Sequence, residues 1–174
     1  MNKIHAPLLL LSLIAIGLSN CTIANIESNK SPDFTKKVSR IYLTAKGYAS
    51  STYLESMSGH LLNGLKSHGV EGDVYYFNPL SLEKEADVIA EKVKSYRPDV
   101  VMSIEQTERR LTSDASGGSN ESGATLDLKL FVPGKENPVW RAFLQVDGSF
   151  WGDIAAKDTA KKIVKKLIAD GVIE

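Results

Sequence analysis

Cysteine and histidine are almost absent from this sequence. Among its 174 residues, Cys21 is the only cysteine, so no disulfide can form within one chain. The only histidines are His5, His60 and His68. His60 and His68 are eight residues apart on one predicted helix and about 80° apart around its axis, which is not the i, i+4 spacing of a metal-ligating pair. The sequence therefore predicts no disulfide framework, no metal site and no cofactor.

An excess of charge of either sign is also absent, since 21 basic residues balance 21 acidic ones. A nucleic-acid partner would need a basic stripe with aromatics between the basic residues, so we expect none. The sequence has no G-x-S-x-G nucleophile elbow. The turn from Lys46 to Thr52 is rich in glycine and hydroxyls and opens a helix, but it lacks the P-loop spacing. Helix capping by Thr52 and Glu55 is the interpretation we favour for this turn; the alternative is an anion bound by its N–H groups. We expect a protein that is not an enzyme.

Long apolar runs are limited to one, from Ala6 to Leu18. A helix that crosses a ~30 Å hydrocarbon core needs about 20 apolar residues, so this run is too short. Its length and the preceding Lys3 fit the apolar region of a secretory signal peptide.

The apolar run ends in Leu18-Ser19-Asn20-Cys21. This stretch resembles the lipobox of bacterial lipoproteins, in which the cysteine is lipidated and becomes the new N-terminus; Asn20 stands where Gly, Ala or Ser is usual. The alternative is an ordinary signal peptide cut near Ser19, with Cys21 left as a free thiol. By the sorting rule of enteric lipoproteins, Thr22 in place of Asp implies the outer membrane, facing the periplasm.

The resemblance divides the chain into three parts. Residues 1–20 are the expected signal peptide, and residues 21–36 are the lipidated cysteine and a polar tether. If the fourteen residues from Thr22 to Thr35 are flexible, their root-mean-square end-to-end distance is about 20 Å. Residues 37–174 are expected to form one domain, long enough to bury a core.

Apolar periodicity predicts an α/β domain with the order β-α-β-α-β-β-β-α. Alternation and short apolar runs indicate strands, and apolar residues at helical spacing indicate helices. The strands are expected at residues 38–45, 74–77, 99–104, 124–132 and 139–146, and the helices at 52–68, 81–96 and 153–170. A low-complexity segment, residues 113–123, is predicted to be a mobile loop. The first three strands imply a parallel half of the sheet, and the last two a C-terminal antiparallel hairpin.

This order of elements resembles the small α/β domains of bacterial envelope proteins, such as the N-terminal domain of TolB and the lipoprotein activators of peptidoglycan synthases. The resemblance is topological and spans about Val38 to Ile173. It implies a domain that binds a protein partner in envelope assembly, secretion or peptidoglycan synthesis.

Two regions are candidate sites. In open α/β sheets, ligands bind at the carboxyl ends of the strands. That edge would gather Lys46, Tyr48, Ser50, Asn78, Glu105 and Arg109. A partner would instead need an exposed aromatic patch, for which we consider Phe131, Phe143 and Trp151. The lysines of the last helix, Lys157, Lys161, Lys162, Lys165 and Lys166, suit either a solvated face or anionic headgroups.

We therefore expect a non-enzymatic lipoprotein that binds an envelope protein. The alternative is a periplasmic domain that binds a small ligand or an envelope glycan at the strand-end edge.

The lipobox interpretation gives a direct prediction. Cys21→Ala should move the protein from the membrane fraction to the soluble fraction, because two or more acyl chains anchor stably and nothing else in the sequence is long and apolar enough to replace them. Fractionation of cells that express either form checks this. A variant that stays with the membrane would contradict the anchor.

Overall fold

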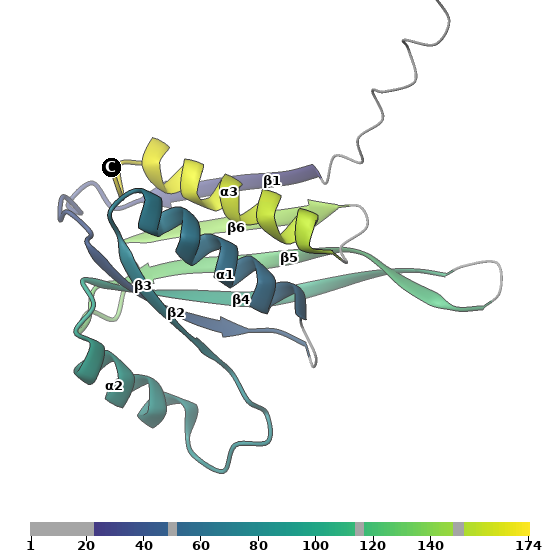
Figure 1. The fold of residues 1–174 in the computed structure, drawn as a ribbon, viewed down its shortest axis with the longest axis horizontal. Coiled ribbons are helices and arrows are strands. Elements are labelled where there is room, and N and C mark those ends of the chain that lie inside the picture. Colours follow the sequence, from purple (N-terminus) through teal and green to yellow (C-terminus); the bar gives the residue numbers. More distant parts are fainter. Residues whose placement is uncertain (1–22, 49–51, 114–116, 148–151) are drawn as a thin grey trace, which may run out of the picture.

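The computed structural model describes residues 23–48, 52–113, 117–147 and 152–174. These residues form a six-stranded mixed sheet and three helices (Figure 1). The elements are β1 (Ile23–Lys30), β2 (Arg40–Lys46), α1 (Thr52–Ser67), β3 (Glu71–Tyr76), α2 (Glu85–Tyr96), β4 (Val100–Ser113), β5 (Ser119–Phe131), β6 (Trp140–Asp147) and α3 (Asp153–Ala169). The predicted α/β class is confirmed.

The strand order across the sheet is β1-β6-β5-β4-β2-β3. Strand β2 pairs parallel with both β3 and β4. The other three pairs, β4 with β5, β5 with β6 and β6 with β1, are antiparallel. The parallel half and the C-terminal hairpin are therefore as predicted. Helices α1 and α3 lie side by side on one face of the sheet, and α2 lies on the opposite face beside β2 (Figure 1).

The core lies between the sheet and the α1–α3 pair. Inward residues alternate along the strands, as Leu126, Leu128 and Leu130 show on β5, and all three are fully buried. Helix α1 contributes Met57, and Trp140 of β6 is 1% exposed. After α3 ends, the chain turns at Gly171, which has a positive φ, and Val172 and Ile173 fold back and are buried.

The predicted tether is wrong for residues 23–30, which form β1. This strand pairs antiparallel with β6, from Ile23 opposite Asp147 to Lys30 opposite Trp140. Its inward side carries Ser28 and Lys30 next to Ile26, so the alternation of apolar residues that predicts a strand is missing. The polar inward groups find acceptors just after α3, because Ser28 donates to Asp170 and Lys30 Nζ donates to the Gly171 carbonyl at 3.2 Å.

The predicted mobile loop is also shorter than expected. Strand β4 continues to Ser113 and β5 begins at Ser119, with Ser113 opposite Ser119 in the ladder. The two strands run past the other strands as a two-stranded ribbon (Figure 1). Backbone pairing does not need apolar side chains, which explains why small polar residues here still form strands.

Helix α2 differs most from its prediction. It begins at Glu85, four residues after the expected Ser81, because the Ser81 hydroxyl instead accepts the Glu83 N–H within a turn. None of its residues is buried, and Leu82, which lies within the predicted helix 81–96, is fully exposed. The helix is held at its C-terminal end, where the Tyr96 ring packs 5.6 Å from the Tyr42 ring.

Asp170, directly after α3, joins three elements. Its Oδ2 accepts hydrogen bonds from Ser28 of β1 at 2.5 Å and from Trp140 Nε1 of β6 at 2.7 Å, and its Oδ1 pairs with Lys166 at 2.9 Å. Burial of the carboxyl disfavours its ionisation, but these donors outweigh burial and lower the pKa of Asp170. The charged form is thus the one that holds β1 to the end of α3.

Asp170→Ala should lower the free energy of unfolding by about 1–3 kcal/mol, because it leaves partly buried donors without an acceptor. The pKa of Asp170 is lowered on folding, so its contribution is present above the ordinary aspartate pKa and is lost as the pH falls through the folded pKa. The stability difference between wild type and Asp170→Asn should therefore shrink from about pH 7 to about pH 3. Urea unfolding at several pH values, monitored by tryptophan fluorescence, measures this difference in the free energy of unfolding. A difference that does not change with pH would contradict an ionised anchor at Asp170.

Candidate functional site

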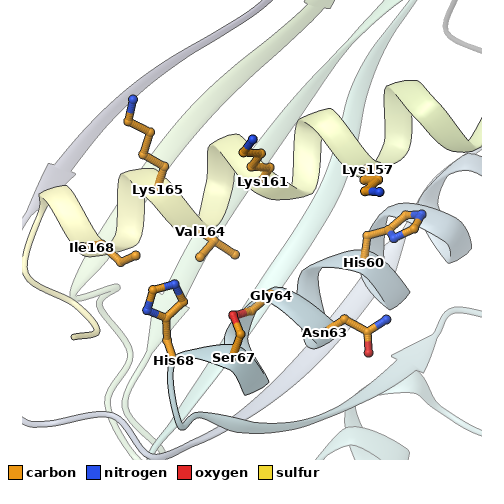
Figure 2. Close-up of a pocket in the computed structure, with 10 residues that line it drawn as sticks. All are labelled: His60, Asn63, Gly64, Ser67, His68, Lys157, Lys161, Val164, Lys165 and Ile168. Carbon is orange, nitrogen blue, oxygen red and sulfur yellow. The ribbon is translucent and has the colours of Figure 1, made fainter.

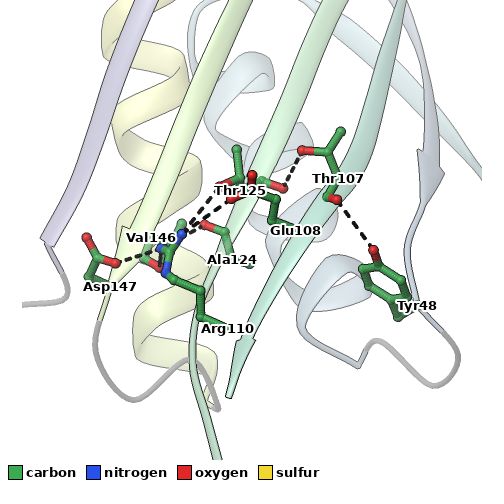
Figure 3. Close-up of polar contacts among 8 residues, drawn as sticks. All are labelled: Tyr48, Thr107, Glu108, Arg110, Ala124, Thr125, Val146 and Asp147. Atoms are coloured by element: carbon green, nitrogen blue, oxygen red, sulfur yellow. Dashed lines mark hydrogen bonds and ion pairs between the residues drawn. The ribbon is translucent and has the colours of Figure 1, made fainter. Parts of the chain in front are cut away.

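The strand-end edge brings together three of the predicted residues. Lys46 at the end of β2 lies opposite Glu105 in the β2–β4 ladder. The Tyr48 hydroxyl donates to the Thr107 carbonyl at 3.4 Å, so the chain after β2 reaches β4 (Figure 3). The predicted Ser50 lies outside the described residues.

Several polar groups of this edge already have partners within the protein. Lys46 Nζ lies 3.2 Å from Glu85 Oε2 and 4.5 Å from the centre of the Phe77 ring. The Asn78 side chain accepts the Leu80 N–H at 3.0 Å and so shapes the loop. Arg109 lies farther along β4, opposite Ala124 of β5. Lys46 and Asn78 are therefore held by internal contacts, and neither of the two cavities described below is lined by the predicted residues of this edge.

A bulge in β4 changes which side chains face outward. The register against β5 shifts between Gln106 and Glu108, so Thr107 has no partner in the ladder. Beyond the bulge, Glu108 and Arg110 lie on the sheet face opposite α1 and α3, beside Thr125. An extra residue in one strand changes the direction of the side chains that follow it. No feature of the sequence predicted this bulge.

Arg110 lies across the β5 backbone and joins three strands. Its Nη2 donates to the Val146 carbonyl at 3.0 Å and to Asp147 Oδ1 at 2.6 Å on β6 (Figure 3). This course depends on Gly123. A Cβ there would lie 2.6 Å from the Val146 carbonyl oxygen and 2.7 Å from Arg110 Nη2. The absent side chain at residue 123 thus makes room for the guanidinium.

The predicted aromatic surface lies partly on this same face of the sheet. Phe143 of β6 is 44% exposed, and Phe131 of β5 is half-buried. Trp151, the third predicted member, lies outside the described residues. No helix of the described chain packs on β5 and β6 on this side, whereas α1 and α3 cover the other (Figure 1). We call this region, β1, β6 and β5 opposite the helix pair, the open sheet face.

An ion pair organises the centre of the open sheet face. Arg141 Nη2 donates to Asp127 Oδ2 at 2.8 Å and Nε donates to Oδ1 at 3.0 Å, and Lys129 Nζ lies 2.9 Å from Oδ2. Burial of Asp127 raises the pKa of its carboxyl, but the two cations outweigh burial and the pKa is lowered. The Arg141 guanidinium also lies 4.5 Å from the centre of the Phe143 ring.

A small cavity of about 150 Å³ lies beside Phe143 on the same face. Its other lining residues are Asn25 and Glu27 of β1, Thr125 of β5 and Gln145 of β6. Strand β1 thus completes the open sheet face. Alternation along 124–132 and 139–146 indicated which residues of β5 and β6 point outward, but it gave no sign of β1.

A serine and a histidine of α1 contact an aspartate at the start of α3. Ser56 Oγ donates to Asp153 Oδ1 at 2.7 Å, and His60 Nε2 lies 2.7 Å from the same oxygen. These contacts, Ser56 first and His60 next, lower the pKa of Asp153. A nucleophile needs a hydrogen bond to its base, whereas here both groups bind the carboxylate. The cluster joins the two helices.

A larger cavity, a groove of about 550 Å³, lies between α1 and α3 (Figure 2). Val164 and Ile168 of α3 and Gly64 of α1 form its apolar floor. Its two sides carry, from α3, Lys157, Lys161 and Lys165, and from α1, His60, Asn63, Ser67 and His68. His68 Nδ1 lies 3.0 Å from the Glu174 carbonyl oxygen. Helical periodicity in the sequence placed these lysines on one helix, but it did not indicate a groove beside them.

Metal-ligand clusters and membrane-spanning helices are absent from the described residues. No group of three or more His, Cys, Asp or Glu side chains there could hold a metal ion. None of the helices in those segments combines the length and apolar character that a membrane crossing requires.

Gly123 provides a test of the Arg110 arrangement. Gly123→Ala should lower the free energy of unfolding by about 1–3 kcal/mol, because the new Cβ forces backbone or guanidinium to move. Gly59→Ala is the matched control: a Cβ at this helical glycine meets nothing within 4 Å, so alanine should stabilise the protein by about 0.5–1 kcal/mol. Thermal unfolding of both variants measures the two shifts. Equal and small effects would show that nothing depends on the space at residue 123.

Comparison with known proteins identifies the fold but no family. No protein-family model and no curated protein sequence matches the chain. PelC from Paraburkholderia phytofirmans, solved as a dodecamer, has a similar structure at 16% identity, with a TM-score of 0.53 over 83% of this chain and 95% of PelC. Lipoprotein GNA1162 from Neisseria meningitidis matches at 15% identity and a TM-score of 0.45, over 76% of this chain and 99% of that one. Hypothetical protein CT253 from Chlamydia trachomatis matches at 11% identity and 0.42, over 77% and 95%. The likeness to PelC shows a shared fold.

Proposed function

We propose that this chain is a lipid-anchored, non-enzymatic protein of the bacterial cell envelope whose domain binds a protein partner through the open sheet face. The observation that carries the proposal is the exposed Phe143, which lies beside Arg141 on a sheet face without a helix layer. Aromatic residues and arginine are enriched at protein interfaces. The partner belongs to envelope assembly, secretion or peptidoglycan synthesis.

The lipobox-like Leu18-Ser19-Asn20-Cys21 supports the envelope location. Thr22, where Asp would favour the inner membrane, supports the outer membrane facing the periplasm. The shared fold with PelC, solved as a dodecamer, makes a second copy of this chain the first partner to test.

The alternative is a small ligand or envelope glycan at the strand-end edge. The structure gives it less support, because Lys46 already pairs with Glu85 and Asn78 binds its own loop. A ligand there would have to break these contacts or bind beside them.

Crosslinking in living cells tests the proposal, with Cys21 intact so that the protein keeps its location. We expect one dominant partner at stoichiometric yield, either a second copy or another envelope protein. Phe143→Ser should reduce its recovery by about tenfold or more, since a central aromatic contact contributes at least about 2 kcal/mol to an interface.

Leu82→Ser is the matched control, because Leu82 is a fully exposed apolar residue away from the open sheet face. Its recovery of the partner should equal that of the wild type. Equal recovery by the wild type and Phe143→Ser would overturn the open sheet face as the interface, and the absence of any partner would favour a ligand at the strand-end edge.

A further inference from the structure

The groove between α1 and α3 combines an apolar floor with a basic side. The floor consists of Val164, Ile168 and the backbone at Gly64, and the α3 side carries three lysines (Figure 2). Its volume of about 550 Å³ is in the range of sites for small molecules, roughly 300–1,000 Å³. The open sheet face has no part in it.

The groove follows from residue size on the two helices. A Cβ at Gly64 would lie 2.9 Å from Val164 Cγ2, so the helices approach closely at this point. Neighbouring Asn63 and Ser67 are short, whereas Lys157, Lys161 and Lys165 follow one another at i, i+4 spacing on α3. Residues four apart rise about 6 Å along a helix, so the lysines form one row beside the floor.

The charge of this row is largely uncompensated. Within the described part of the chain, no ion pair or hydrogen bond joins Lys161 or Lys165 to another residue. Lys157 lies near Asp153, whose carboxylate binds His60 at one end of the groove. Glu174 stands at the other end, where its side chain pairs with Lys37. The α3 rim of the groove therefore carries two free ammonium groups that an anion could bind.

Apolar side chains are exposed on the same outer side of α3. Ile168, in the floor, is 36% exposed, and Ile154, near the start of the helix, is 76% exposed. An occupant that only carried charge would leave these side chains in water. A ligand with an acidic head and an apolar tail satisfies the lysine row and the floor together.

The position of the expected anchor, Cys21, indicates that membrane lipids are the nearest ligands with an acidic head and an apolar tail. Strand β1 begins at Ile23, two residues after Cys21, which is at most about 7 Å of extended chain. Strand β1 contacts α3, and Lys30 reaches the Gly171 carbonyl. A lipid on Cys21 would therefore hold α3 close to the membrane surface.

We propose that the α1–α3 groove binds an anionic phospholipid of the membrane that anchors the chain. The phosphate head lies along Lys161 and Lys165, and the upper part of an acyl chain lies on Val164 and Ile168. The choice of a membrane lipid as the source rests on the proposed lipid anchor; the site itself does not.

Native mass spectrometry of the full-length protein in neutral detergent tests the site directly. The probes are dihexanoyl phosphatidylglycerol and, as the uncharged-head control, dihexanoyl phosphatidylcholine. We expect one phosphatidylglycerol adduct, in clear preference to phosphatidylcholine. The double variant Lys161→Gln, Lys165→Gln should weaken it by about tenfold or more, since each lysine near an anionic headgroup contributes about 1 kcal/mol. Ile168→Gln should weaken it as well, because the floor loses its apolar contact.

The matched control is Lys92→Gln, Lys94→Gln, two exposed lysines of α2, which should bind phosphatidylglycerol as the wild type does. Equal adducts with both lipids, equal loss in both double variants, or displacement by inorganic phosphate at the same concentration would overturn the proposal. So would dimers that disappear in Ile168→Gln without added lipid, since they would assign the groove to a second copy. These results do not depend on whether the crosslinking experiment finds a partner. Failure of the open sheet face as an interface can therefore be distinguished from failure of the groove as a lipid site.

Discussion

The connections between strands determine which parts of this sheet are covered. Helical crossovers join β2 to β3 and β3 to β4, and these two crossovers run in opposite directions across the sheet, so α1 and α2 lie on opposite faces. Hairpins join β4 to β5 and β5 to β6, and hairpins supply no helix. Helix α3 follows β6 and packs beside α1. Within the described segments, no layer therefore covers the face of β5, β6 and β1 opposite this pair, as antiparallel sheets allow.

Strand β1 changes the relation between the domain and its proposed anchor. A flexible tether would let the domain turn freely above a membrane, with a reach of about 20 Å for fourteen residues. Strand β1 instead pairs with β6 from Ile23 onward, and Asp170 fixes it to the end of α3. The link from Cys21 to the ordered sheet is then two residues, which restricts how the domain can be oriented. The position of every surface relative to the lipid thus depends on one strand whose inward side is largely polar.

Sequence patterns predicted most elements because their signal is local. Alternating apolar residues in 124–132 and 139–146 indicated both strands and the outward position of Phe143, and helical spacing indicated α1 and α3. What the patterns missed depends on contacts between distant residues. Ser28 and Lys30 are tolerated on the inward side of β1 because Asp170 and the Gly171 carbonyl accept their hydrogen bonds. The bulge that re-aims Arg110 and the groove beside Gly64 likewise arise from pairs of elements, so neither segment alone carries a sign of them.

The two proposed binding surfaces lie on opposite sides of the sheet, and this separation has a physical consequence. The lysine row of α3 and the exposed Phe143 of β6 are divided by the helix layer and the sheet itself. An occupant of one surface therefore does not cover the other. A lipid in the α1–α3 groove would turn the helix layer toward the membrane and the open sheet face away from it. The same contact that holds the domain at the membrane would then present Phe143 and Arg141 to a partner in the periplasm.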